Sequence, residues 1–195
     1  MAGLFDSTDA RFRDANLIYV GYCSSDAYAG NGTVSDFNFR FAGRAIVKAV
    51  FDDLVAAQGL GANAGTQVMY GGCSAGARGA LFNADDVHAQ LDAALGAKLA
   101  RFGALLDSMF YVEIEPYDTT LPSLMSITEQ ATLMTGAVNH AMPACAAAYP
   151  AEADAWRCFF GQCVPRHLCV GLPGARSAEP PMPPMPPCSP ESPPC

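Results

Sequence analysis

The chain has 195 residues, of which 51% are hydrophobic and only 15% are charged. This length and composition fit one globular domain with a buried core and exclude a chain that is disordered throughout. The net charge of −8 comes without any cluster of Lys or Arg, which argues against nucleic acid or an anionic membrane as a partner. No apolar run approaches the roughly 18 residues that a membrane span needs, and the first residues lack the apolar core of a signal peptide.

The first predicted elements are a strand and a helix. Leu17–Val20 is a short run of apolar, β-favouring residues that ends at a glycine, so it predicts a buried strand. A polar loop rich in Gly and Ser follows. The segment 41–60 predicts a helix, because two sets of apolar residues recur every fourth position and make a wide apolar stripe: Ile46, Val50 and Leu54, and Val47, Phe51 and Val55.

Four further elements are predicted along the chain. A brief strand at 67–70 ends at two glycines, and a helix at 75–95 follows them. The segment 101–108 predicts a third strand, 126–138 a further helix, and 145–169 a loop-rich region. Strand, helix, strand, helix, strand at this spacing indicates βαβ units, so the predicted fold class is α/β, with a parallel sheet flanked by helices.

The composition changes abruptly after residue 170. The stretch "EPPMPPMPPCSPESPPC" holds nine of the fifteen prolines, and such sequence enters neither a helix nor a sheet. We therefore expect one domain over 1–170 and an extended, disordered tail over 171–195. The tail contains PxxP spacings, which leave open a role as a ligand for a proline-reading domain.

The pattern Gly-x-Ser-x-Gly lies between a predicted strand and a predicted helix, as in the nucleophile elbow of α/β-hydrolases. Ser74 is the candidate nucleophile, and the backbone N–H of Ala75 is placed to donate to a developing oxyanion. In so sharp a turn, side chains at Gly72 and Gly76 would collide, so both glycines are predicted to be necessary. The alternative is a glycine-rich turn in another βαβ protein, because short motifs of small residues recur by chance.

The same turn carries no nucleotide-binding motif. The chain has no Gly-x-x-x-x-Gly-Lys-Ser/Thr, and "GGCSAG" does not supply the order Gly-x-Gly-x-x-Gly. We therefore expect no phosphate-bearing ligand at this turn and no cofactor.

Four segments occur together in a recognisable order: "YCSSDAYAGN" (22–31), the helical segment 39–60, "GGCSAGARGALFNADDV" (71–87) and "WRCFFGQ" (156–162). With them the chain resembles the pectin acetylesterase family from about Ala15 to about Leu168. The resemblance implies a secreted α/β-hydrolase that cleaves carboxylic esters through a Ser-Asp-His triad. Its substrate would be an acetylated polysaccharide or an acylated protein.

The resemblance also assigns roles to individual residues. Ser74 matches the family's nucleophile and Ala75 an oxyanion donor, while Asp107 matches an aspartate near the site that has at most a supporting role. Cys145 and Cys158 match cysteine positions of the family, which implies a disulfide between them. An extracellular or secretory-pathway location follows from the same resemblance.

The family's triad acid and histidine have no counterpart in this chain, so we expect an incomplete member. No aspartate follows Asp154. His88 lies fourteen residues beyond Ser74 on the same predicted helix, about 20 Å away, and should be a surface residue. Neither His140 nor His167 falls where the family places its base. A serine hydroxyl without a base is a poor nucleophile at neutral pH.

The remaining cysteines leave further expectations. The set Cys158, Cys163, His167 and Cys169 has an uncommon spacing for a zinc site, and we prefer a disulfide and no metal. Cys23 is expected to be a free thiol, and Cys73 to be buried and reduced.

Three functions stay open. The first is a serine esterase with an incomplete site, and the second is a non-catalytic binding module that keeps the hydrolase fold. The third is a zinc-stapled interaction protein with a proline-rich arm. In every case an incomplete sheet predicts open edges, marginal stability and aggregation.

Overall fold

The structure is a computed structural model, and it describes residues 12–36, 38–109, 111–112, 114–137, 142, 145, 147 and 149–160. His140, His167 and the segment 171–195 lie outside these residues. The division into a domain over 1–170 and a proline-rich tail therefore stays a prediction.

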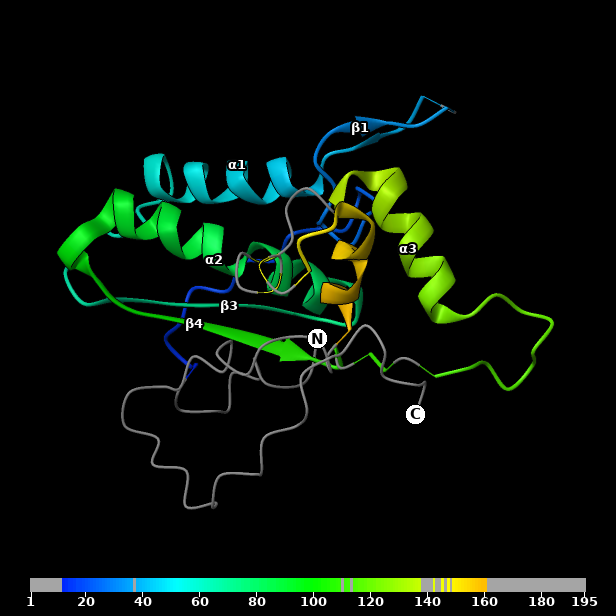
Figure 1. The fold of residues 1–195 in the computed structure, drawn as a ribbon. Helices are drawn as coiled ribbons and strands as arrows, with labels where there is room; N and C mark the ends of the chain where they lie inside the picture. Colours follow the sequence, from blue (N-terminus) through cyan, green and yellow to red (C-terminus); the bar gives the residue numbers. More distant parts are fainter. Residues whose placement is uncertain are drawn as a thin grey trace, which may run out of the picture.

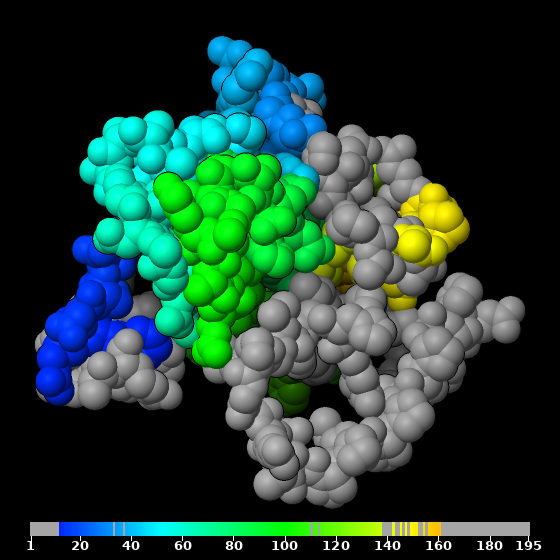
Figure 2. All heavy atoms as spheres, turned by 90° about the vertical axis from the view of Figure 1, so that its left-hand side faces the viewer, coloured from blue at the N-terminus to red at the C-terminus, as the bar shows by residue number. Residues whose placement is uncertain are grey.

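The described elements form two layers, with helices over a parallel pair of strands. In chain order they are β1 (Thr33–Val34), β2 (Arg40–Phe41), α1 (Gly43–Ala56), β3 (Thr66–Cys73), α2 (Ala75–Leu95), the 3₁₀ helix η1 (Gly96–Lys98), β4 (Leu99–Asp107), α3 (Leu124–Thr135) and the 3₁₀ helix η3 (Glu152–Phe159). The helices α1 and α2 run side by side on one face of the β3–β4 pair (Figure 1). The short β1–β2 hairpin projects beyond α1 (Figure 2).

β3, α2 and β4 make one βαβ unit. The two strands pair in parallel from Thr66 opposite Leu99 to Cys73 opposite Asp107, so they end together at one edge of the sheet. The predicted fold class, α/β with a parallel sheet and flanking helices, is confirmed. β3 is longer than the predicted 67–70, because both glycines continue the strand.

The first predicted strand is wrong. Leu17–Val20 belongs to no strand, and Leu17, Ile18 and Tyr19 are 59%, 56% and 73% exposed. An apolar run becomes a strand only where a neighbouring strand accepts its hydrogen bonds, and no described strand pairs with this run. The polar loop predicted next (23–36) contains β1, and β2 follows just beyond it, so the two form a hairpin where no strand was predicted.

Two apolar clusters hold the elements together, and α2 takes part in both. Val47 and Phe51 of α1 pack against Val87, Leu91 and Leu95 of α2. Val47 and Phe51 belong to the predicted stripe and form its buried centre, while the other stripe residues are half-buried beside them. The N-terminal half of α2 belongs to a second cluster, with residues from the segments around α3 and η3: Ala77, Leu81, Phe82, Met109, Met142, Trp156, Phe159 and Phe160.

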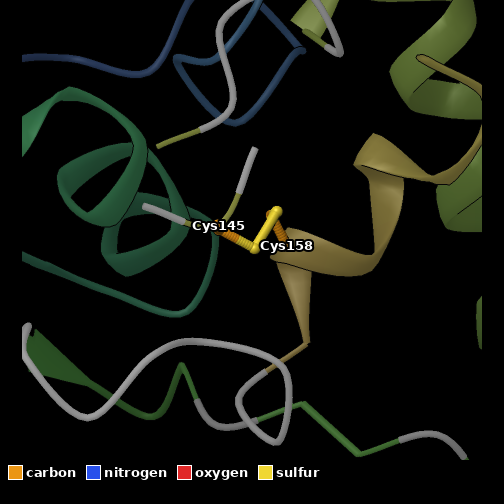
Figure 3. Close-up of a disulfide and its surroundings, with 2 residues drawn as sticks. All are labelled: Cys145 and Cys158. Atoms are coloured by element: carbon orange, nitrogen blue, oxygen red, sulfur yellow. A yellow bond between two sulfur atoms is a disulfide. The ribbon is translucent and has the colours of Figure 1, made fainter. Parts of the chain in front are cut away.

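A disulfide lies inside this second cluster. Cys145 and Cys158 are joined by an S–S bond of 2.01 Å, and both are fully buried. Figure 3 shows the bond attaching the η3 segment beside α2. The pairing is the one that the family resemblance implies. It links η3 to the segment at Cys145, and both cysteines lie in the cluster that contains the N-terminal half of α2.

The stretch "YCSSDAYAGN" joins α1 to α2 through a buried carboxylate. Asp26 accepts hydrogen bonds from the backbone N–H groups of Gly43 and Tyr28, each at 2.8 Å, and from the Ser24 hydroxyl. Gly43 is the first residue of α1, so Asp26 caps that helix from seventeen residues away. Asn83 of α2 donates to the Tyr28 carbonyl oxygen at 2.8 Å and ties the same loop to the second helix.

Candidate active site

Ser74 lies in a strained turn between β3 and α2. Its backbone angles are φ 54° and ψ −117°, a conformation that residues other than glycine rarely adopt. Its N–H donates to the carbonyl oxygen of Asp107 at 3.0 Å, which holds the turn against the end of β4. The residue is exposed, and its hydroxyl makes no capping hydrogen bond to α2.

The two glycines on either side of Ser74 have different surroundings. A Cβ at Gly72 would overlap the backbone of Gly76 and come within 2.8 Å of the Ala77 nitrogen. The collision predicted for Gly72 is therefore present. A Cβ at Gly76 would meet no described atom within 4 Å outside the backbone of its own helix and its chain neighbours, so the collision predicted at that position is not found in this part of the chain.

Ala75 is the first residue of α2, at the carboxyl edge of the sheet. The first N–H groups of a helix have no partner within the helix, and they carry the positive end of its dipole. The backbone N–H of Ala75 therefore adjoins Ser74 as a donor that the helix itself does not use. Its role as an oxyanion donor stays a prediction.

Asp107 lies beside Ser74, because its backbone carbonyl oxygen accepts the hydrogen bond from the Ser74 N–H. It ends β4 opposite Cys73, and its side chain is exposed. Its carboxylate accepts a hydrogen bond from the Ser108 hydroxyl at 2.9 Å. Ser108 also has a positive φ, of 58°. Each of the two parallel strands is thus followed directly by an exposed serine with a positive φ, and nothing in the sequence indicated the second one.

Arg78 is a further residue that the sequence reading missed. It lies one turn into α2, and its N–H donates to the Ser74 carbonyl oxygen at 3.1 Å. Its guanidinium lies over the Tyr111 ring, with the central carbon 3.8 Å from the ring centroid, and 5.8 Å from that of Phe159. Burial lowers the pKa of Arg78 from its ordinary value, and the side chains of Tyr111 and Tyr22 oppose that shift.

His88 does not reach the Ser74 hydroxyl. It is exposed, and its ring stacks on that of Phe102 with centroids 4.8 Å apart and an interplanar angle of 7°. Phe102 pairs with Val68, five residues before the end of β3, which is about 17 Å from that end. The prediction that His88 is a surface residue is confirmed. His140 and His167 lie outside the described residues.

The cysteines differ from the expectations in one respect. Cys23 and Cys73 are both free and exposed, so the prediction that Cys73 is buried is wrong. Successive residues of a strand face opposite sides, and Cys73 falls on the side of β3 away from α2. The group of residues considered as a zinc site lacks one ligand, because the Cys158 sulfur is bonded to Cys145. Nowhere among the described residues do three or more potential metal ligands converge.

A positive-φ serine between the strand and helix of a parallel βαβ unit defines the class of the protein, the α/β-hydrolase fold. The family model described as pectinacetylesterase matches residues 2–172. The chain therefore belongs to the pectinacetylesterase family.

Its relatives are carboxylesterases. The chain is 29% identical over 152 residues to the palmitoleoyl-protein carboxylesterase NOTUM of Homo sapiens, covering 76% of this chain and 30% of the human protein. It is 30% identical over 156 residues to the Drosophila melanogaster protein of the same name, covering 77% of this chain and 22% of that protein. A crystal structure of the Wnt deacylase Notum from Drosophila matches 78% of this chain and 43% of its own, with a TM-score of 0.66 and 28% identity. The chain thus spans less than half the length of these relatives.

Proposed function

We propose that the protein is a carboxylic-ester hydrolase with Ser74 as its nucleophile. The observation that carries the proposal is the backbone of Ser74, at φ 54° and ψ −117° between β3 and α2. Strain of this kind persists only where the surroundings impose it, and it clusters at catalytic residues. It holds an exposed hydroxyl at the N-terminus of a helix, where a developing negative charge is favoured.

In the proposed reaction the Ser74 oxygen attacks the carbonyl carbon of the ester, and its proton passes to a base. The tetrahedral intermediate places its oxyanion near the Ala75 N–H. Collapse of the intermediate releases the alcohol, which takes the proton back from the base, and leaves an acyl group on Ser74. Water then hydrolyses the acyl-enzyme. By resemblance the base is a histidine oriented by an acid, and no described residue holds that position.

The substrate class follows from the relatives. Those named above act on a palmitoleoyl-protein or on Wnt, and the family model takes its name from pectin acetyl esters. The proposed substrate is therefore an ester on an acylated protein or an acetylated polysaccharide, met outside the cell. A disulfide in the core supports that location, because such bonds persist in oxidising compartments. In the described part of the chain, no helix is both long and apolar enough to cross a membrane.

A fluorophosphonate probe, which bonds to activated serines, tests the nucleophile. The chain offers a matched control, because Ser108 shares exposure, positive φ and a place at the end of a strand with Ser74. We expect the wild type and Ser108→Ala to be labelled and Ser74→Ala not to be labelled. Rates of labelling should be compared at equal protein concentration, after circular dichroism has shown that all three chains are folded.

Two results would count against the proposal. Equal labelling of Ser74→Ala and the wild type would place the reactive serine elsewhere. No labelling of a folded wild-type chain would favour the non-catalytic binding module, because a strained serine without a base gains nothing over an ordinary hydroxyl.

A further inference from the structure

Arg78 is a half-buried cation whose charge is not balanced within the described chain. No carboxylate of the described residues forms an ion pair with it, and its Nε is buried without a hydrogen-bond partner. Taking a guanidinium out of water costs free energy unless an anion or several acceptors compensate. The two rings beside Arg78 compensate only in part, because a cation–π contact is weaker than a carboxylate pair.

Three other cations of the described residues are in ion pairs. Arg44 contacts Asp86, Lys48 contacts Asp52 at 2.6 Å, and Arg157 contacts Asp154 at 3.2 Å. The chain carries nineteen acidic residues against eleven Lys and Arg, so acceptors are plentiful. None of the described carboxylates pairs with Arg78, so among the described residues its charge is left for an anion that binds beside it.

The position of Arg78 relates this partner to the candidate active site. Its N–H is bonded to the Ser74 carbonyl oxygen, so the two residues are one helical turn apart. Long side chains on a helix point back toward its N-terminus, which here is the turn that carries Ser74. Tyr111 follows β4, so the ring under the guanidinium lies beyond the same carboxyl edge of the sheet.

We propose that Arg78 binds a carboxylate carried by the ester that reaches Ser74, so that the protein prefers acidic esters to neutral ones. The inference rests on the proposed function, because the ligand is a substrate only if Ser74 is the nucleophile. The binding of the carboxylate itself does not require turnover. The Tyr111 ring lies against the guanidinium, with the central carbon 3.8 Å from the ring centroid, and so limits the positions that the group can take. A planar fork of N–H donors fixed in this way matches the two oxygens of a carboxylate.

Binding is measured in a Ser74→Ala background, so that no ligand is consumed and the result does not depend on the nucleophile. The probes are monoethyl succinate, which has one ester and one carboxylate, and diethyl succinate, which has two esters and no charge. Dissociation constants come from NMR titrations of the ¹⁵N-labelled chain. We expect the charged probe to bind about fivefold more tightly, the upper range for a partly exposed ion pair.

Variants of Arg78 assign that preference to one side chain. Arg78→Met keeps an apolar stem against Tyr111 and removes the charge, so the fivefold preference should disappear while the amide spectrum stays that of a folded chain. Arg78→Lys keeps the charge without the planar fork and should retain part of the preference. Arg157→Met is the matched control, because Arg157 also lies over a ring, that of Trp156 at 4.7 Å, but is paired with Asp154. It should leave the preference unchanged.

Equal binding of the two probes in the Ser74→Ala chain overturns the inference, and so does a preference that survives Arg78→Met. A preference lost in Arg78→Met alone supports it. The fluorophosphonate experiment fails or succeeds separately, because it depends on Ser74 and its base and uses no charged ligand.

Discussion

The two glycines that flank Ser74 provide a test of the strained turn at the scale of single residues. An added methyl group at Gly72 meets the backbone of Gly76 and Ala77, which cannot move without opening the first turn of α2. We expect Gly72→Ala to lower the free energy of unfolding by about 1–3 kcal/mol, as overpacking does. The same substitution at Gly76 meets no described atom, and its effect should stay within about 0.5 kcal/mol.

Urea denaturation of both variants beside the wild type measures the difference, provided that the slope of the transition is unchanged. Comparing the two variants separates the effect of the collision in the sharp turn from the effect of replacing any glycine. Equal effects of the two substitutions would mean that the turn relaxes, and that the close approach of Gly72 to Gly76 does not hold Ser74 in place.

The residues of the site were predictable to different degrees. Ser74, Ala75 and Gly72 could be proposed because a short motif reports the shape of a turn, and the turn is formed by local sequence. Arg78 and Ser108 could not. The environment of Arg78 is set by Tyr111 and Phe159, which lie far along the chain, and the backbone angle of Ser108 depends on where β4 ends. Sequence spacing carries no information about either.

Among the elements, α1 depends on a residue far from it in sequence. Its N-cap residue, Ala42, has no side chain that can accept a hydrogen bond, and its first turn contains no acidic residue. Asp26 supplies the acceptor and is only 7% exposed. We expect Asp26→Ala to lower the free energy of unfolding by about 3 kcal/mol, because buried N–H groups lose a charged acceptor.

Asp36→Ala is the control for Asp26→Ala, since Asp36 is an exposed aspartate of the neighbouring loop. Its effect should stay within about 0.5 kcal/mol. Asp26→Asn keeps one carbonyl oxygen and should recover part of the loss. The midpoints of urea unfolding report all three, and a shift for Asp26→Ala no larger than that for Asp36→Ala would show that the cap contributes nothing.

The elements themselves were predictable where a periodic pattern coincides with burial. α1, α2 and β4 were expected within a few residues of their bounds, because an apolar stripe or run identifies the side that packs. The strand predicted over Leu17–Val20 was wrong because a strand needs a neighbouring strand to pair with. The pattern of one segment does not show whether another segment lies beside it. The hairpin strands β1 and β2 have two residues each, too few for an alternating pattern to appear.

At the scale of the whole molecule, the β3–β4 sheet is covered unevenly. Parallel sheets are ordinarily buried on both faces, yet along β3 half-buried and exposed residues alternate. Val68 and Tyr70 face the helices, whereas Met69 on the other face is 43% exposed. Burial under the helices raises the pKa of the Tyr70 hydroxyl above its ordinary value. The exposed Met69 on this face and the unpaired strand edges of the described sheet favour association between molecules.

We therefore expect the chain to self-associate reversibly as its concentration rises, through the face of β3 that carries Met69. Met69→Gln should weaken that association by about 1 kcal/mol, or roughly fivefold in the association constant, because part of a methionine side chain would no longer be removed from water.

Met134 is a matched control, since it is 46% exposed but lies on α3. Met134→Gln should leave the association unchanged if the sheet face is responsible. Sedimentation equilibrium at several concentrations measures the constants, and a wild-type chain that stays monomeric and melts in one sharp transition would show that the exposed face does not drive contact between molecules.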